Sequence, residues 1–174
     1  MENCCEKVKR ELALNLSSFL MSKRVKPVFL CVGSDKVVGD LVGVLVGEML
    51  LKKHHINAFV YGSLDYAITS KNLPEVIRYV KQNHLNSPII VVDGILGKLD
   101  EIGMIKYYPF GSVPGGQFNK GALVGDYSIL GVVETSGINS LNFLRSVKLK
   151  TVVDVATFIA DAIAMAFRFG VGLI

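Results

Sequence analysis

Short apolar runs alternate along the chain with longer segments in which apolar residues recur at helical spacing. The apolar runs predict β-strands, because aliphatic and β-branched residues bounded by Gly, Pro or Asn are typical of buried strands. The segments with helical spacing predict helices that bury one face. On this basis the predicted strands are 26–32, 57–62, 88–93, 102–109 and 127–134, and the predicted helices are 2–22, 40–53, 72–84, 138–147 and 151–169.

The order of the predicted elements indicates how the strands pair. Strand, helix, strand, helix, strand at the start of the chain is typical of a parallel sheet covered by helices. Only about eight residues separate the third strand from the fourth, and a parallel crossover takes about a dozen or more. The fourth strand is therefore expected to run antiparallel. The predicted fold class is α/β, a three-layer α/β/α arrangement around a mixed, mostly parallel five-stranded sheet.

Composition agrees with one folded unit. Residues 1–174 are predicted to form a single domain, with an N-terminal helix in 1–24 and an apolar C-terminal helix in 151–174. The hydrophobic fraction of 51% and the charged fraction of 20% allow a substantial core and exclude a disordered chain. The net charge of +4 is scattered along the sequence, which argues against a nucleic-acid partner.

The C-terminal helix is the segment that most resembles a membrane span. Its sequence is interrupted by three charged residues, which are Asp154, Asp161 and Arg168. A charge at the centre of a spanning helix costs about 3 kcal/mol, so a buried helix is expected and no membrane partner. The apolar surface of the same helix is a reason to expect a homo-oligomer.

Cysteine and histidine give little evidence of a metal or disulfide site. The cysteines have no CxxC spacing, and they are Cys4, Cys5 and Cys31. They favour reduced thiols and hence a cytoplasmic protein. The histidines all fall at predicted helix ends, where exposed capping residues are expected, and they are His54, His55 and His84.

Candidate chemistry lies where the predicted parallel strands end, because open α/β sheets bind ligands beyond the carboxyl ends of their strands. Asp40 opens the helix after the first strand, and Asp93 ends the third strand. Adjacent parallel strands would bring both carboxyl groups to one crevice. Each acid also has a structural explanation: Asp40 as a helix N-cap, and Asp93 as a carboxylate held by loop amides.

The two environments are expected to separate the pKa values of the pair. A helix N-terminus should lower the pKa of Asp40, and apolar surroundings should raise the pKa of Asp93. Two carboxyl groups with separated pKa values suit general acid–base hydrolysis, so an endopeptidase without metal or cofactor is predicted, with a protein or peptide as substrate. Two alternatives remain open. One is a non-catalytic module that binds a peptide, and the other is metal-assisted hydrolysis with Asp126 or Glu134 as a further oxygen ligand.

A glycine-rich segment, GSVPGGQFNKG at 111–121, is expected on the same rim of the sheet or near it. Glycines let the backbone approach a ligand closely, and successive N–H groups can bind an anion or a carbonyl oxygen, although the composition also fits a surface loop. It matches neither the P-loop nor the GxGxxG spacing. The predicted substrate-binding residues are Gly33, Ser34, Gly39, Gly94, Pro114, Gly115, Gly116 and Lys120.

Four motifs in this order resemble the YyaC family of sporulation proteins, which are classed as spore proteases. They are CVGSDKVVGDLVGVLVG, FVYGSLDYAITSKNL, PIIVVDGILGK and SVPGGQFNKGALVGDYSILGVVETSG, within residues 27–140. The family is similar to the germination protease of spores and to the hydrogenase maturation endopeptidases. The resemblance implies the phosphorylase/hydrolase-like fold, with an antiparallel fourth strand.

The resemblance also implies roles for the two acids. The germination protease has two aspartates as its proposed catalytic pair, at positions that match Asp40 and Asp93 here. The hydrogenase proteases have acids at both positions and add a histidine that binds nickel. Residues 94–140 of this sequence contain no histidine, which argues against nickel dependence.

Overall fold

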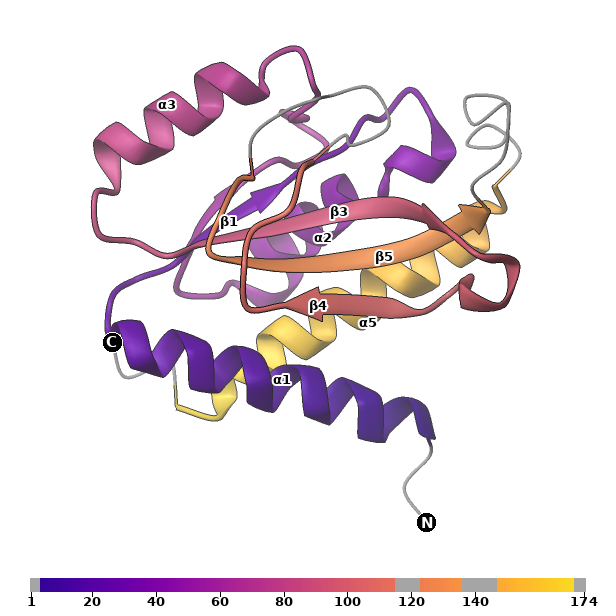
Figure 1. Ribbon diagram of the computed structural model, residues 1–174, viewed down its shortest axis with the longest axis horizontal. Helices are drawn as coiled ribbons and strands as arrows, with labels where there is room; N and C mark the ends of the chain where they lie inside the picture. The colour runs from indigo at the N-terminus through magenta and orange to yellow at the C-terminus, as the bar shows by residue number, and fades with distance from the viewer. Residues whose placement is uncertain (1–3, 115–122, 136–146, 171–174) are drawn as a thin grey trace.

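A sheet of five strands lies at the centre of the computed structural model, with helices on both faces (Figure 1). The structure describes residues 4–114, 123–135 and 147–170. The strands are β1 (Val28–Cys31), β2 (Phe59–Tyr61), β3 (Ile89–Gly97), β4 (Ile105–Tyr108) and β5 (Tyr127–Thr135). The longer helices are α1 (Cys4–Lys23), α2 (Val42–Met49), α3 (Leu73–Asn83) and α5 (Leu149–Arg168). The predicted α/β class is confirmed.

The strands lie in the order β2-β1-β3-β5-β4, and β4 runs antiparallel to β5 while the other pairs are parallel. Between β3 and β4 the chain has room only for the 3₁₀ turn η3 (Leu99–Glu101), so it turns back without a crossover helix. The predicted direction of the fourth strand is confirmed. β1 and β3 are neighbours, with Cys31 opposite Val92.

Successive residues of the central strands enter two different hydrophobic clusters, because side chains alternate between the two faces of a strand. One cluster packs against α1, α2 and α5 and includes Phe29, Cys31, Ile90 and Val92. The other packs against α3 and includes Val28, Leu30, Ile89 and Val91. Coverage on both faces explains why the strands are apolar throughout. Burying one such side chain contributes about 1.5–3 kcal/mol.

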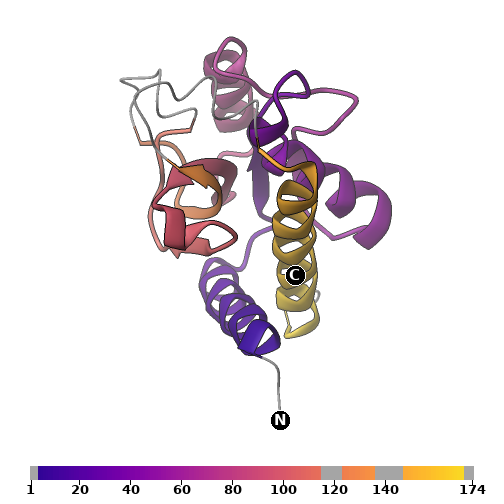
Figure 2. The same ribbon diagram turned by 90° about the vertical axis from the view of Figure 1, so that its right-hand side faces the viewer.

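Helix α5 is buried between α1 and α2, beside β5 (Figure 2). Its buried residues are Val152, Val155, Ala156, Ile159, Ala160, Ala162, Ile163, Ala164 and Ala166. The three phenylalanine and methionine side chains that are only partly buried also pack on the core, and they are Phe158, Met165 and Phe167. Most of the apolar sequence that suggested an oligomer is therefore accounted for within one chain.

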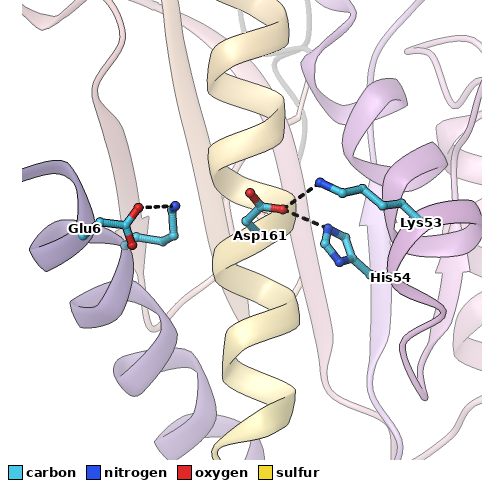
Figure 3. A network of polar contacts seen from close by, with 5 residues as sticks. Glu6, Lys53, His54 and Asp161 are labelled. Carbon is cyan, nitrogen blue, oxygen red and sulfur yellow. Dashed lines mark hydrogen bonds and ion pairs between the residues drawn. The ribbon is translucent and has the colours of Figure 1, made fainter.

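A polar network ties α5 to the segment that follows α2 (Figure 3). The Nζ of Lys53 donates to Oδ1 of Asp161 at 3.0 Å, and Nε2 of His54 lies 3.0 Å from the same oxygen. Only 10% of the His54 side chain is exposed, so the prediction of an exposed cap is wrong for this residue. Burial, followed by the charge of Lys53, lowers the pKa of His54.

The predicted helix at 40–53 is divided into three pieces in the structure. A 3₁₀ turn, η1 (Val38–Asp40), precedes α2, and a π-helical turn, η2 (Leu50–His54), follows it. The predicted helix at 138–147 lies almost entirely outside the described residues. Within the part of the chain that the structure describes, no helix combines the length and apolar character that crossing a membrane requires.

Candidate active site

The carboxyl end of β1, the neighbouring residues 92–94 of β3 and the loop 33–40 form one site on the sheet, which we call the rim. β3 continues to Gly97, so the prediction that Asp93 ends the third strand is wrong. The ladder between β1 and β3 extends one residue beyond β1, where the N–H of Val32 donates to the carbonyl oxygen of Val92 at 2.8 Å. The chain leaves β1 at the next residue, Gly33, while Asp93 is the residue after Val92. The two segments that carry the predicted acids therefore start from the same level of the sheet.

The loop after β1 folds back so that Asp40 returns to the place where the loop begins. The N–H of Ser34 donates to the carbonyl oxygen of Asp40 at 2.9 Å. A Cβ atom on Gly33 would lie 2.1 Å from that same oxygen, so a side chain there would push the two segments apart. The close approach of backbone to backbone requires glycine at this position.

Two further glycines, Gly39 and Gly94, bring the loop against β3. A Cβ atom on Gly94 would lie 3.0 Å from the carbonyl oxygen of Gly39 and 3.2 Å from Cγ2 of Val42. Asp40 directly follows one of these glycines, and Asp93 directly precedes the other. The backbone contact therefore brings together the two segments that carry these acids, although the acids are more than fifty positions apart in the chain.

Asp93 lies deep in the rim. Only 3% of its surface is exposed, and its Oδ1 accepts a hydrogen bond from the N–H of Gly94 at 2.8 Å. The alternation along β3 puts Asp93 on the same sheet face as Val91, the face that α3 covers. A carboxyl group buried to this degree is costly unless other polar groups compensate, which makes Asp93 unusual among the core residues.

Asp40 corrects two predictions. It ends the 3₁₀ turn η1, and the residue at the N-cap of α2 is Leu41, without a side-chain capping bond. The predicted cap is therefore wrong, and the predicted fall in the pKa of Asp40 is wrong as well. Burial raises the pKa of Asp40 from 3.8 to about 6. The physical reason is desolvation of the carboxyl group, and Asp40 lies in the turn before α2 and not at the N-cap of that helix.

Comparison with known proteins assigns the family. Residues 2–162 match a family described as a protein of unknown function, DUF1256. The chain belongs to the DUF1256 family. This DUF1256 chain is 32% identical over 162 residues to the uncharacterized protein YyaC of Bacillus subtilis, which covers 91% of the chain and 78% of that protein. No solved structure matches the chain significantly.

Four of the predicted substrate-binding residues lie on the rim of the DUF1256 chain, and they are Gly33, Ser34, Gly39 and Gly94. The hydroxyl oxygen of Ser34 accepts the N–H of Lys36 at 3.2 Å and so closes the turn of the loop. Pro114 is buried at the edge of a described segment, and Gly115, Gly116 and Lys120 lie outside the described residues.

The glycine-rich segment leaves the sheet at the opposite end from the rim. Tyr108, the last residue of β4, pairs with Ser128 at the start of β5. The two sides of the segment meet there, since Ser112 and Val124 form an antiparallel bridge. The segment was expected on the rim or near it. This expectation is wrong for the residues where the segment leaves and rejoins the sheet, because β4 is antiparallel and ends beside the amino ends of the parallel strands.

The alternative of metal-assisted hydrolysis loses Asp126 as a ligand. The Oδ2 of Asp126 accepts the N–H of Ile89 at 2.9 Å, at the amino end of β3 and away from the rim. Glu134 lies opposite Leu96 in β5, and its Oε1 accepts the N–H of Thr135 at 2.7 Å. Over the described ranges, no three residues of the types His, Cys, Asp and Glu gather closely enough to hold a metal ion.

Proposed function

We propose that this protein is an endopeptidase in which Asp40 and Asp93 act as a general acid–base pair on a protein substrate of a sporulating bacterium. The observation that carries the proposal is the pKa of about 6 at Asp40, a group partly buried on the rim beside a second buried acid. Perturbed carboxyl groups of this kind are frequent at functional sites. The similarity to the germination protease at both acid positions also supports it.

The two environments favour different roles. With a pKa of about 6, Asp40 keeps its proton in roughly one molecule in ten at pH 7, which suits a general acid. Asp93, whose Oδ1 accepts the N–H of Gly94, is assigned the role of general base. In the proposed reaction Asp93 takes a proton from water as its oxygen attacks the peptide carbonyl carbon. Asp40 then gives its proton to the amide nitrogen as the C–N bond breaks.

The test is cleavage of a proteome-derived peptide library, with new termini identified by mass spectrometry. The wild type should generate new termini, and Asp40→Asn and Asp93→Asn should each lose this activity. Asp35→Asn is the matched control, because Asp35 is an exposed acid in the same loop. Far-UV circular dichroism of each variant separates loss of chemistry from loss of fold. Cleavage that persists in both asparagine variants rules out the proposed pair.

A second candidate is a non-catalytic module that holds a peptide at the same rim. The observation that favours it is the 3% exposure of Asp93, because a hydrolytic water must reach this carboxyl group. Such a module would be stabilised by a bound peptide without cleaving it. A rise in melting temperature with peptides that are recovered intact would identify this function and exclude the first.

A further inference from the structure

A hollow of about 390 Å³ lies between α3 and the loop that follows β2. Three tyrosines line it, Tyr61 at the end of β2, Tyr66 in the loop and Tyr79 on α3. The polar side chains of α3 that line it are Glu75, Arg78 and Gln82. The volume is in the range of about 300–1,000 Å³ that is usual for small-ligand sites.

Two of the three tyrosines, Tyr66 and Tyr79, are not explained by packing of the core. Helix α3 buries Leu73, Val76 and Val80, whereas 54% of Tyr79 and 63% of Tyr66 remain exposed. The rings of Tyr61 and Tyr79 lie edge to face with their centroids 6.1 Å apart. Aromatic rings held in this way present apolar surface to water, and such rings are favoured at binding surfaces.

The structure explains the position of one charged residue of the hollow, Glu75, but not that of the other, Arg78. Glu75 lies in the first turn of α3, where the helix dipole favours an acid. Arg78 lies one turn further on and makes no ion pair with any residue in the described ranges. A guanidinium group presents a planar set of donors that matches a carboxylate in a bidentate manner. Arg78 is therefore the group of the hollow that lacks a structural role.

We propose that this hollow, which we call the tyrosine pocket, binds a short peptide segment in which an aromatic side chain lies next to a carboxylate. The aromatic ring would pack among Tyr61, Tyr66 and Tyr79, and the carboxylate would pair with Arg78. The carboxylate can come from an acidic side chain or from the end of a peptide chain.

The tyrosine pocket is separate from the rim. Tyr61 lies in register with Leu30 of β1, which pairs with Val91 of β3, so β2 is two strands, about 10 Å, from β3. The proposed binding therefore goes beyond the proposed hydrolysis and does not depend on it. A peptide could bind here whether or not Asp40 and Asp93 are catalytic.

The binding test uses two probes that differ in the source of the carboxylate. One is the blocked tetrapeptide acetyl-Gly-Phe-Asp-Gly-amide, and the other is acetyl-Gly-Gly-Phe with a free terminal carboxylate. Calorimetric titration of the full chain should give saturable binding of at least one probe. Replacing Phe by Ala, or the carboxylate by its amide, should weaken that binding about tenfold. The probe that binds identifies the source of the carboxylate.

The protein variants assign the binding to the pocket. Arg78→Gln should weaken the binding of the tighter probe about tenfold, and Tyr79→Ala should weaken it by a similar factor. Lys81→Gln removes another exposed cation of α3 that does not line the hollow, and it should leave the affinity unchanged. Arg78 and Tyr79 are both exposed, so these variants should fold. Absence of saturable binding by both probes, or equal effects of Arg78→Gln and Lys81→Gln, would overturn the proposal.

Discussion

Replacing Asp40 by Asn should make the protein more stable at neutral pH while it removes the proposed activity. The folded state keeps the Asp40 carboxyl group in partly desolvated surroundings, and burial raises its pKa from 3.8 to about 6. Ionising the group costs more free energy in these surroundings than it does in the unfolded chain. Asparagine has nearly the same shape and no charge, so the variant avoids this cost.

The magnitude follows from the difference between the two pKa values. The rise from 3.8 to about 6 is roughly two units, and each unit corresponds to about 1.4 kcal/mol, so the full effect is about 3 kcal/mol. Because Asp40 is partly exposed, we expect about 2–3 kcal/mol. The folded state holds the proton more tightly, so the free energy of unfolding falls as pH rises from about 3.8 to about 6.

Urea denaturation followed by far-UV circular dichroism is the appropriate assay, because the chain contains no tryptophan. At about pH 8 the free energy of unfolding of Asp40→Asn should exceed that of the wild type by about 2–3 kcal/mol, and this difference should disappear as the pH approaches 4. For a chain of this size the gain corresponds to roughly 4–12 °C in melting temperature. Asp35→Asn, in the same loop, should leave the pH dependence unchanged. An Asp40→Asn protein less stable than the wild type at pH 8 would refute the reasoning.

Three further changes test other contacts. Gly43→Ala would bring its Cβ 2.0 Å from the carbonyl oxygen of Val32, so α2 must shift. Urea denaturation should show that the free energy of unfolding falls by roughly 2 kcal/mol or more. An unchanged midpoint would contradict this packing. Asp126→Ala leaves the N–H of Ile89 without its acceptor and should cost about 1–3 kcal/mol in the same assay, and Asp126→Asn should cost less because it keeps an acceptor oxygen. Burial lowers the pKa of His54, so its contribution to stability is lost as pH falls below about 6.5. The melting temperatures of His54→Gln and the wild type should therefore converge on acidification, and a widening gap would argue against it.

The sheet was predictable because local pattern and topology point to the same answer. The run at 88–93 is apolar on both faces, as expected for a central strand, and it forms the first part of β3. The strand continues to Gly97 because β5 pairs with it as far as Thr135, a tertiary contact that the apolar pattern does not report. The short connection before β4 determined the direction of that strand. Chain geometry, more than residue preference, made this prediction succeed.

The errors at the rim have a different origin. An aspartate before a helical segment is usually a cap, yet here Asp40 ends a 3₁₀ turn before α2 begins, and its carbonyl oxygen accepts the N–H of Ser34. That bond depends on the close approach at Gly33, which no periodicity reveals. The tyrosine pocket was missed for a related reason, since Tyr61, Tyr66 and Tyr79 lie on three different segments.

The glycines of the rim and its acids form one physical unit. Gly33 and Gly94 each meet a backbone carbonyl at a distance that leaves little or no room for a side chain, so backbone contacts hold Asp40 beside β3. Contacts of this kind exclude water, and exclusion of water is what raises the pKa of Asp40. An arrangement selected for stability alone would place an amide or an apolar side chain there, because either avoids the cost of ionisation. The acid at this position is therefore not explained by a contribution to stability, which agrees with the role of proton donor that we propose for it.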